Sequence, residues 1–136
     1  CDIVLAADHA TFQDAPHYPS GLVPGDGVHV VWQALLGLNR ARYFLLTGQV
    51  LSAGEALALG VVNEVLPQGA LLDRAWVLAR QLRARPHITN RLTREAMLIQ
   101  LKRQMLEQLP YGLALEGLAA ADWWPTHFEA KDISKG

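Results

Sequence analysis

Residues 16–27 read Pro16-His17-Tyr18-Pro19-Ser20-Gly21-Leu22-Val23-Pro24-Gly25-Asp26-Gly27. The stretch is too rich in Pro and Gly for a regular helix or strand, and turn-forming residues of this kind fix a loop. It carries an imidazole and a carboxylate, on His17 and Asp26. These are the minimal groups for activating water by general-base catalysis. Taken alone, the spacing between His17 and Asp26 is weak evidence for catalysis. It favours a simpler interpretation, a surface loop whose His and Asp cap nearby backbone groups.

Composition and charge exclude several classes of protein. The chain has 136 residues, of which 51% are hydrophobic, and a formal net charge of −1. It is long enough to bury a core, it does not resemble a disordered chain, and its charge gives no case for a nucleic-acid partner. The single cysteine excludes an internal disulfide, and no apolar run reaches the length of a membrane span. We therefore expect a cytoplasmic protein with no nucleic-acid or membrane partner.

The chain opens on an apolar, β-branched run. Residues 1–7 read Cys-Asp-Ile-Val-Leu-Ala-Ala, which predicts a buried strand that is already under way. Because a domain seldom starts inside a core strand, we expect this chain to be the C-terminal piece of a longer protein.

The pattern of residues along the chain predicts an α/β fold. Strands are expected at residues 3–7, 10–12 and 61–66, and helices at 29–37, 40–46 and from the capping box at Ser52 to Gly60. From residue 67 the pattern is helical, with helices at 71–82, from Pro86 to Pro110, and at 111–121. We expect residues 1–66 to form a β/α core that carries the loop 16–27, and residues 67–136 to form a helical oligomerisation region.

The apolar face of the helical region is wider than one small domain needs. Two interpretations remain open for the leucines of residues 71–121. They pack on another subunit, or they cover a missing N-terminal half of the protein.

Short motifs follow one another in an order that resembles the crotonase (enoyl-CoA hydratase/isomerase) superfamily. The matching pieces are Cys1–Ala7, Phe12 with Pro16, Gly21–Gly27, Leu45–Gln49, Leu51–Ala56 and Gly60–Val65. This resemblance implies the C-terminal part of the crotonase (ClpP-like) spiral β/α core. It also implies that the helices after that core build a homotrimer or a dimer of trimers.

Two departures from the usual pattern of this superfamily bear on the chemistry. Enoyl-CoA hydratases usually place a catalytic Glu straight after the proline that is Pro16 here, where this chain has His17, and a small residue where it has Asp26. The sequence is therefore more similar to the β-diketone hydrolase branch, of the 6-oxocamphor hydrolase type. Members of that branch split the carbon–carbon bond between two carbonyls with water, by a retro-Claisen cleavage, and use no CoA.

The resemblance implies roles for three residues and no cofactor. His17 would be the base toward water, Asp26 its orienting partner, and Glu116 a pocket residue, although Glu116 is equally typical of an exposed helix carboxylate. The resemblance further implies that an oxyanion hole and another histidine lie upstream of Cys1. The five histidines show no metal-ligand spacing, so we expect no metal.

The sequence leaves three functions open. The leading one is a β-diketone hydrolase acting on a small-molecule substrate. The second is an enoyl-CoA hydratase or isomerase. Residues 128–131 (Phe-Glu-Ala-Lys) match the superfamily's usual CoA-phosphate signature only faintly, which weakens the case for CoA binding. The third is a truncated oligomerisation fragment without activity.

Overall fold

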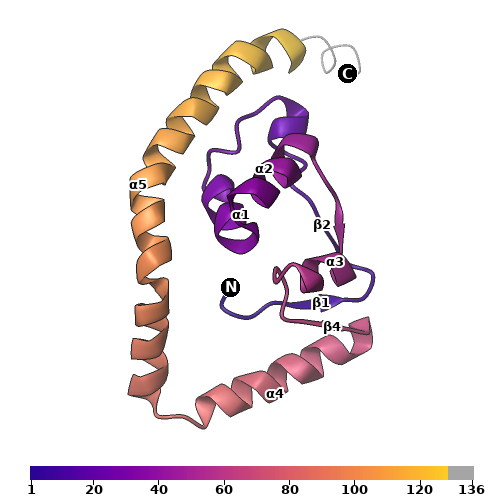
Figure 1. Ribbon diagram of the computed structural model, residues 1–136, viewed down its shortest axis with the longest axis vertical. Helices are drawn as coiled ribbons and strands as arrows, with labels where there is room; N and C mark the ends of the chain where they lie inside the picture. The colour runs from indigo at the N-terminus through magenta and orange to yellow at the C-terminus, as the bar shows by residue number, and fades with distance from the viewer. Residues whose placement is uncertain (129–136) are drawn as a thin grey trace, which may run out of the picture. The chain divides into compact units, whose positions relative to one another are not determined.

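Short strands and longer helices alternate along the chain, as expected for an α/β fold (Figure 1). The computed structural model of the protein describes the backbone of residues 1–128 and the side chains of residues 1–122, so the segment 128–131 lies largely outside the described residues. The elements in chain order are β1 (Leu5–Ala7), β2 (Thr11–Phe12), the 3-10 helix η1 (Tyr18–Ser20), α1 (Val28–Leu36), α2 (Leu38–Thr47), β3 (Leu51–Ser52), α3 (Ala53–Ala58), β4 (Glu64–Leu66), the 3-10 helix η2 (Gln68–Ala70), α4 (Leu71–Arg83) and α5 (His87–Phe128).

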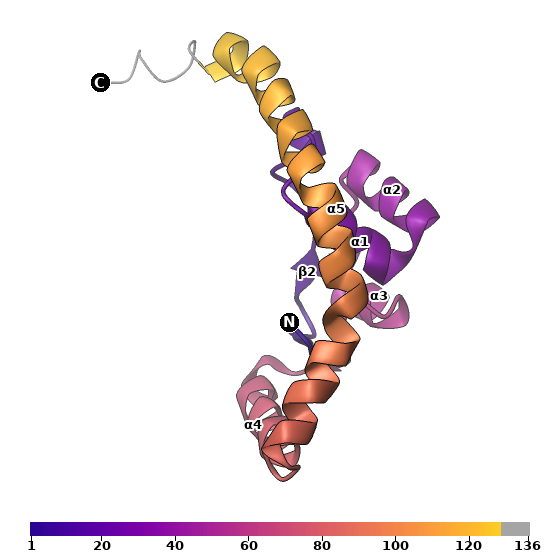
Figure 2. The ribbon, with the colours of Figure 1, turned by 90° about the vertical axis from the view of Figure 1, so that its left-hand side faces the viewer.

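The prediction that a helix ends at Pro110 is wrong. Helix α5 continues through this proline as one element from His87 to Phe128, and its ribbon is unbroken in Figure 2. A proline inside a helix removes the hydrogen bond to the carbonyl four residues earlier, here that of Leu106. Leu106 is 80% exposed, so it lies on a face of the helix where water can reach that carbonyl. None of the helices in residues 1–128 is both long enough and apolar enough to cross a membrane.

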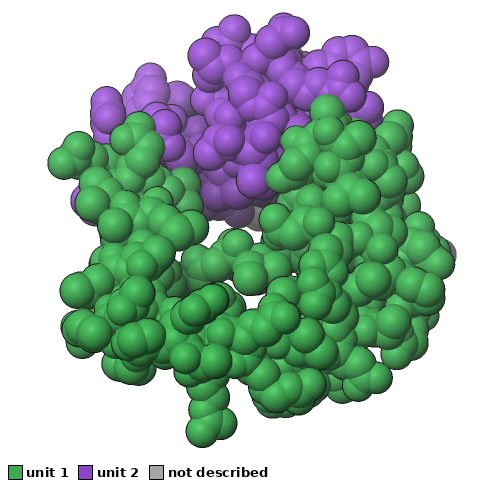
Figure 3. All heavy atoms as spheres, turned by 60° about the horizontal axis from the view of Figure 1, so that its bottom comes forward, with its two compact units in different colours: residues 1–12, 50–103 green, residues 13–49, 104–136 purple. Residues whose placement is uncertain are grey.

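The chain groups into two compact units, each made of two separate stretches. Unit 1 comprises residues 1–12 and 50–103, and unit 2 comprises residues 13–49 and the stretch from residue 104 onward (Figure 3). The sequence-based division at residue 66 concerns a different property, the change from mixed to helical elements, and stays a prediction.

Unit 1 holds the four strands of the described residues. Strands β1 and β4 pair in parallel, with Leu5 opposite Glu64, and β2 pairs antiparallel with β3. Strand β4 begins three residues later than the sequence predicted, because the amides of Val61 and Val62 donate to the carbonyl of Ala56 at 2.8 and 3.3 Å. These bonds close the end of α3, and the residues that pair in register with β1 are Glu64, Val65 and Leu66.

The capping box predicted for α3 is confirmed. The Ser52 hydroxyl accepts from the Glu55 amide, and the Glu55 carboxylate accepts from the Ser52 amide at 2.8 Å. Both contacts satisfy amides that the first turn of a helix leaves without a partner. Gly60 takes the left-handed conformation expected after this helix, with φ of 75°.

Unit 2 is built around the pair of helices α1 and α2, which pack against each other (Figure 1). Gly37 separates them with a φ of 73°, a value that few side-chain-bearing residues adopt. Trp32 of α1 and Phe44 of α2 place their ring centroids 4.2 Å apart, and Phe44 is fully buried. The loop that precedes α1 carries the candidate site, and this packed pair of helices anchors the end of that loop.

Candidate active site

His17 is held by the backbone of the loop that carries it. Its carbonyl accepts two hydrogen bonds, from the amides of Ser20 at 2.8 Å and Leu22 at 3.0 Å. The 3-10 helix η1 begins at Tyr18 and has Pro19 in its first turn, and Gly21 ends it in the left-handed conformation. The Pro and Gly residues that marked this stretch in the sequence therefore close a tight turn around His17, as expected of them.

The imidazole of His17 is buried against a second carboxylate that the sequence analysis did not single out. Nδ1 of His17 lies 2.6 Å from Oδ1 of Asp14, and the two residues are only 7% and 3% exposed. The signal that could have found Asp14 is its place three residues before His17, two residues after the short strand β2. Asp14 thus makes the short hydrogen bond to the imidazole, and the role of Asp26 as an orienting partner stays a prediction.

Asp26 lies on the opposite side of the imidazole. Its Oδ2 is 3.5 Å from Nε2 of His17, an ion-pair distance that is long for a direct hydrogen bond, and its side chain is 49% exposed. Its other oxygen, Oδ1, accepts from the amide of Val28 at 3.2 Å, at the start of α1. One carboxylate oxygen therefore fixes Asp26 to the backbone while the other faces His17.

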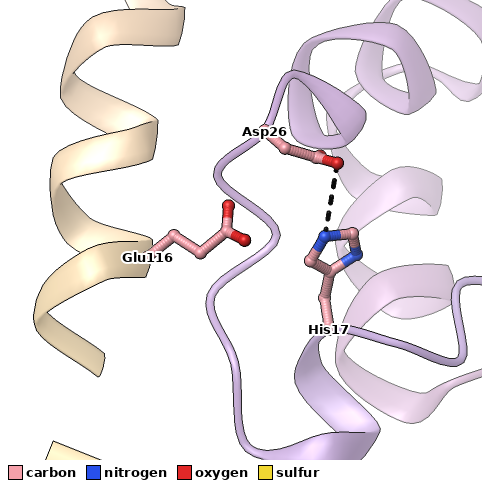
Figure 4. Close-up of side chains that lie close together, drawn as sticks. All are labelled: His17, Asp26 and Glu116. Carbon is pink, nitrogen blue, oxygen red and sulfur yellow. Dashed lines mark ion pairs between the residues drawn. The ribbon is translucent and has the colours of Figure 1, made fainter. Parts of the chain in front are cut away.

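Glu116 reaches the same place from α5. Figure 4 shows its carboxylate extending from the helix toward the loop that carries His17 and Asp26. The loop and the helix approach each other through two glycines, since a Cβ added at Gly25 or Gly112 would collide with the backbone carbonyl of the other. This contact between backbones leaves Glu116, one helical turn beyond Gly112, beside the loop. Glu116 Oε2 is buried and has no hydrogen-bond partner among the described residues.

A further histidine fixes the loop without belonging to the cluster. His29 of α1 places Nδ1 2.7 Å from the carbonyl oxygen of Pro24 and so ties the loop to the first turn of the helix. A hollow of about 400 Å³ lies beside this contact and is bordered by His29, Tyr111 and Leu115, but none of His17, Asp26 and Glu116 lines it.

The pKa of His17 reflects opposing effects. Burial disfavours the charged imidazolium and by itself lowers the pKa. The hydrogen bond to Asp14 and the negative charges of Asp14, Asp26 and Glu116 act in the opposite direction and outweigh it, so the pKa of His17 is raised above 6.5. The imidazole is therefore a stronger base than a histidine in water.

The geometry brings together all three residues that the sequence singled out. One atom each of His17, Asp26 and Glu116 lies within 4.8 Å of the other two. A base flanked by two carboxylates can hold and deprotonate a water molecule. The same three atoms are also of the kinds that bind divalent cations, with one ligand from each residue.

Comparison with known proteins identifies the family of the chain. The sequence model of the enoyl-CoA hydratase/isomerase family matches residues 1–116. A curated short-chain-enoyl-CoA hydratase of Clostridium acetobutylicum is 29% identical over 126 residues, which are 93% of this chain and 46% of that protein. A carnitinyl-CoA dehydratase of Citrobacter koseri is 40% identical over 81 residues, 60% of this chain and 31% of that protein.

Solved structures agree with the family and add a second activity. A β-diketone hydrolase from the cyanobacterium Anabaena sp., bound to (S)-3-oxocyclohexyl acetic acid, is 52% identical with a TM-score of 0.87, covering 89% of this chain and 48% of that one. An enoyl-CoA hydratase of Mycobacterium paratuberculosis is 30% identical with a TM-score of 0.81, covering 90% of this chain and 55% of that one. The chain thus spans about half the length of these relatives.

The expectation drawn from the order of motifs is confirmed for both family and fold, since the family match covers most of the chain and the similar structures superpose on nearly all of it. The chain belongs to the enoyl-CoA hydratase/isomerase family and has the α/β fold of the crotonase superfamily.

Proposed function

We propose that the whole protein is a hydrolase that cleaves a carbon–carbon bond of a cyclic β-diketone with water. The observation that carries this proposal is that the buried His17 lies beside two carboxylates. Oδ2 of Asp26 is 3.5 Å from Nε2, and one ligand atom each of His17, Asp26 and Glu116 lies within 4.8 Å of the other two. The solved structure at 52% identity is a β-diketone hydrolase, and the ligand bound to it is both a ketone and a carboxylic acid. A keto acid is what hydrolysis of a β-diketone ring produces.

In the proposed reaction His17 acts first as a base and then as an acid. Nε2 takes a proton from a water molecule held between His17 and the carboxylates, and the hydroxide oxygen bonds to one carbonyl carbon. The bond from that carbon to the carbon between the two carbonyls then breaks, and its electron pair forms an enolate. The proton on Nε2 is delivered to the enolate carbon, which gives a ketone and a carboxylic acid without any other reactant.

The two carboxylates stabilise the charged state of the base. An imidazolium forms when the water loses its proton, and the negative charges of Asp26 and Glu116 favour that state. A ketone is not activated by a thioester group, so its attack by water benefits from such a base. The reaction as written needs no metal ion.

The proposal is tested by expressing the protein from its complete gene, purifying it, and incubating it with a bicyclic 1,3-diketone in ¹⁸O-labelled water. We expect a keto acid that carries one ¹⁸O atom in its carboxylate, detected by mass spectrometry. Addition of EDTA should leave the rate unchanged. Loss of activity with EDTA would show that the cluster of His17, Asp26 and Glu116 binds a metal ion that the reaction needs. Absence of any keto acid would overturn the proposal.

Hydration or isomerisation of an enoyl-CoA is the second candidate. It is favoured by the names of two curated relatives, which are short-chain-enoyl-CoA hydratases. It is opposed by His17, which occupies the position after Pro16 where the hydratases usually have a glutamate. Rapid conversion of crotonyl-CoA by a preparation that leaves diketones intact would select this candidate.

We also propose that the protein works as a homotrimer or a dimer of trimers. Apolar side chains remain exposed along the two long helices, among them Leu72, Trp76, Ile88, Leu92 and Met97. Large exposed apolar side chains on successive turns are typical of surfaces that another chain covers. Analytical ultracentrifugation should give a discrete trimer or hexamer, whereas a stable monomer would contradict the proposal.

A further inference from the structure

We propose that Asp14 is the residue that positions His17, by holding its proton on Nδ1 and thereby leaving Nε2 free to act as the base. The inference rests on the proposed function for the use of that base, but the state of the imidazole can be measured without any substrate.

The geometry of the pair is that of a charge-assisted hydrogen bond. Nδ1 of His17 and Oδ1 of Asp14 are 2.6 Å apart, and neither side chain is more than 9% exposed. A carboxylate can only accept, so the hydrogen between these atoms belongs to the imidazole. A neutral imidazole has one N–H group, and placing it on Nδ1 leaves the lone pair on Nε2.

Asp14 has no competing partner among the described residues. Its second oxygen, Oδ2, is buried and receives no hydrogen bond there. A buried carboxylate that lacks other donors depends on its one partner for stabilisation, and here that partner is His17. The backbone adds to this constraint, because the two amide bonds to the His17 carbonyl keep the imidazole close to Asp14.

Asp26 is placed for a different task. It faces Nε2 and not Nδ1, it is half exposed, and one of its oxygens is already engaged by the Val28 amide. A residue on the Nε2 side can stabilise the imidazolium or hold the water, but it cannot direct the proton to Nδ1. The titratable groups that act on His17 are thus Asp14 at Nδ1, Asp26 at Nε2, and Glu116, which clusters with His17 and Asp26.

The first test reads the tautomer directly in the unmodified protein. Long-range ¹H–¹⁵N spectra of histidine-labelled protein separate protonated from unprotonated ring nitrogens, and the signals of His17 are those missing from the His17→Gln variant. Above the pKa of His17 we expect Nδ1 to carry the hydrogen and Nε2 to carry none. A hydrogen on Nε2 would overturn the proposal.

The second test is Asp14→Asn, which keeps the size of the side chain and removes its charge. We expect kcat to fall about a hundredfold or more with little change in KM, because an amide can donate to Nδ1 and so favour the wrong tautomer. The acid limb of the pH profile should move to lower pH, which loss of structure alone would not cause. An unchanged tautomer and pH profile in a folded Asp14→Asn protein would contradict the proposal.

Asp8→Asn is the matched control. Asp8 and His9 form a similar pair, 3.1 Å apart, with both side chains more than 60% exposed. The substitution should leave the signals of His17 and the activity unchanged. The outcomes also separate the two proposals: a hydrogen on Nδ1 in a protein that cleaves no diketone rejects the function alone, and a hydrogen on Nε2 in an active hydrolase rejects the role of Asp14 alone.

Discussion

Two histidines of the described residues place Nδ1 beside an aspartate that is close in sequence. His9 and Asp8 are adjacent, lie in unit 1 and form an exposed contact of 3.1 Å. His17 and Asp14 lie in unit 2 and form a buried contact of 2.6 Å. Solvent screens the first pair, whereas burial strengthens the second and excludes competing water. The residue types supply the chemistry in both places, but only burial on a fixed loop turns them into a positioned base.

The largest effect should come from removing each histidine in turn. His17→Ala removes the base, and we expect diketone turnover to fall by about a hundredfold to ten-thousandfold. His9→Ala removes an exposed side chain and should leave turnover within error of the unmodified protein. Steady-state kinetics with a cyclic 1,3-diketone measure both, and equal losses in the two variants would remove the distinction between the pairs.

Asp26→Asn should have the next largest effect, because it removes the charge that faces Nε2. We expect turnover to fall by about a hundredfold. The double variant His17→Ala/Asp26→Asn should be little slower than His17→Ala, because groups that act as a unit are not additive. Asp73→Asn, at an exposed position on α4, is the control. Losses that multiply in the double variant would show that the two residues act independently.

Gly112→Ala tests how the site around the buried pair is assembled. The added methyl group would collide with the Gly25 carbonyl. We therefore expect the free energy of unfolding to fall by about 1–3 kcal/mol. Gly117→Ala is the matched control on the same helix, since nothing lies within 4 Å of its added methyl group. That variant should be more stable by up to about 1 kcal/mol, from helix propensity alone. Urea unfolding of both proteins measures the difference, and a stabilised Gly112→Ala would contradict the close approach.

The smallest effect is a dependence of stability on pH. The pKa of His17 is raised in the folded protein above its value of 6.5 in the unfolded chain. The resulting stabilisation is fully present below pH 6.5 and is lost as pH rises through the folded pKa. Urea unfolding between about pH 5 and 9 should show this loss in the unmodified protein. His17→Gln should lack it, and an identical pH dependence in that variant would assign the effect to other groups.

Local patterns in the sequence were sufficient for much of the fold. The capping box at Ser52, the left-handed glycine after α3 and the Pro/Gly loop around His17 depend on residues that are close together in the chain. Such features follow from backbone conformation and hydrogen bonds within a few residues, so the sequence predicts them. Local reasoning was wrong at Pro110. A proline usually ends a helix because it removes one backbone hydrogen bond, but α5 continues through this one.

The sequence by itself also determined the family and the three residues of the candidate site. The order of motifs, and the departures at His17 and Asp26 from the residues usual in enoyl-CoA hydratases, can be read without a structure. What only the tertiary structure decided is which carboxylate meets which nitrogen. The approach of Gly25 to Gly112 brings Glu116 to the loop over a distance of many residues, and the burial of Asp14 gives it, and not Asp26, the hydrogen bond to Nδ1. Contacts between distant segments and the exclusion of water depend on how the whole chain packs, and no local pattern of residues encodes them.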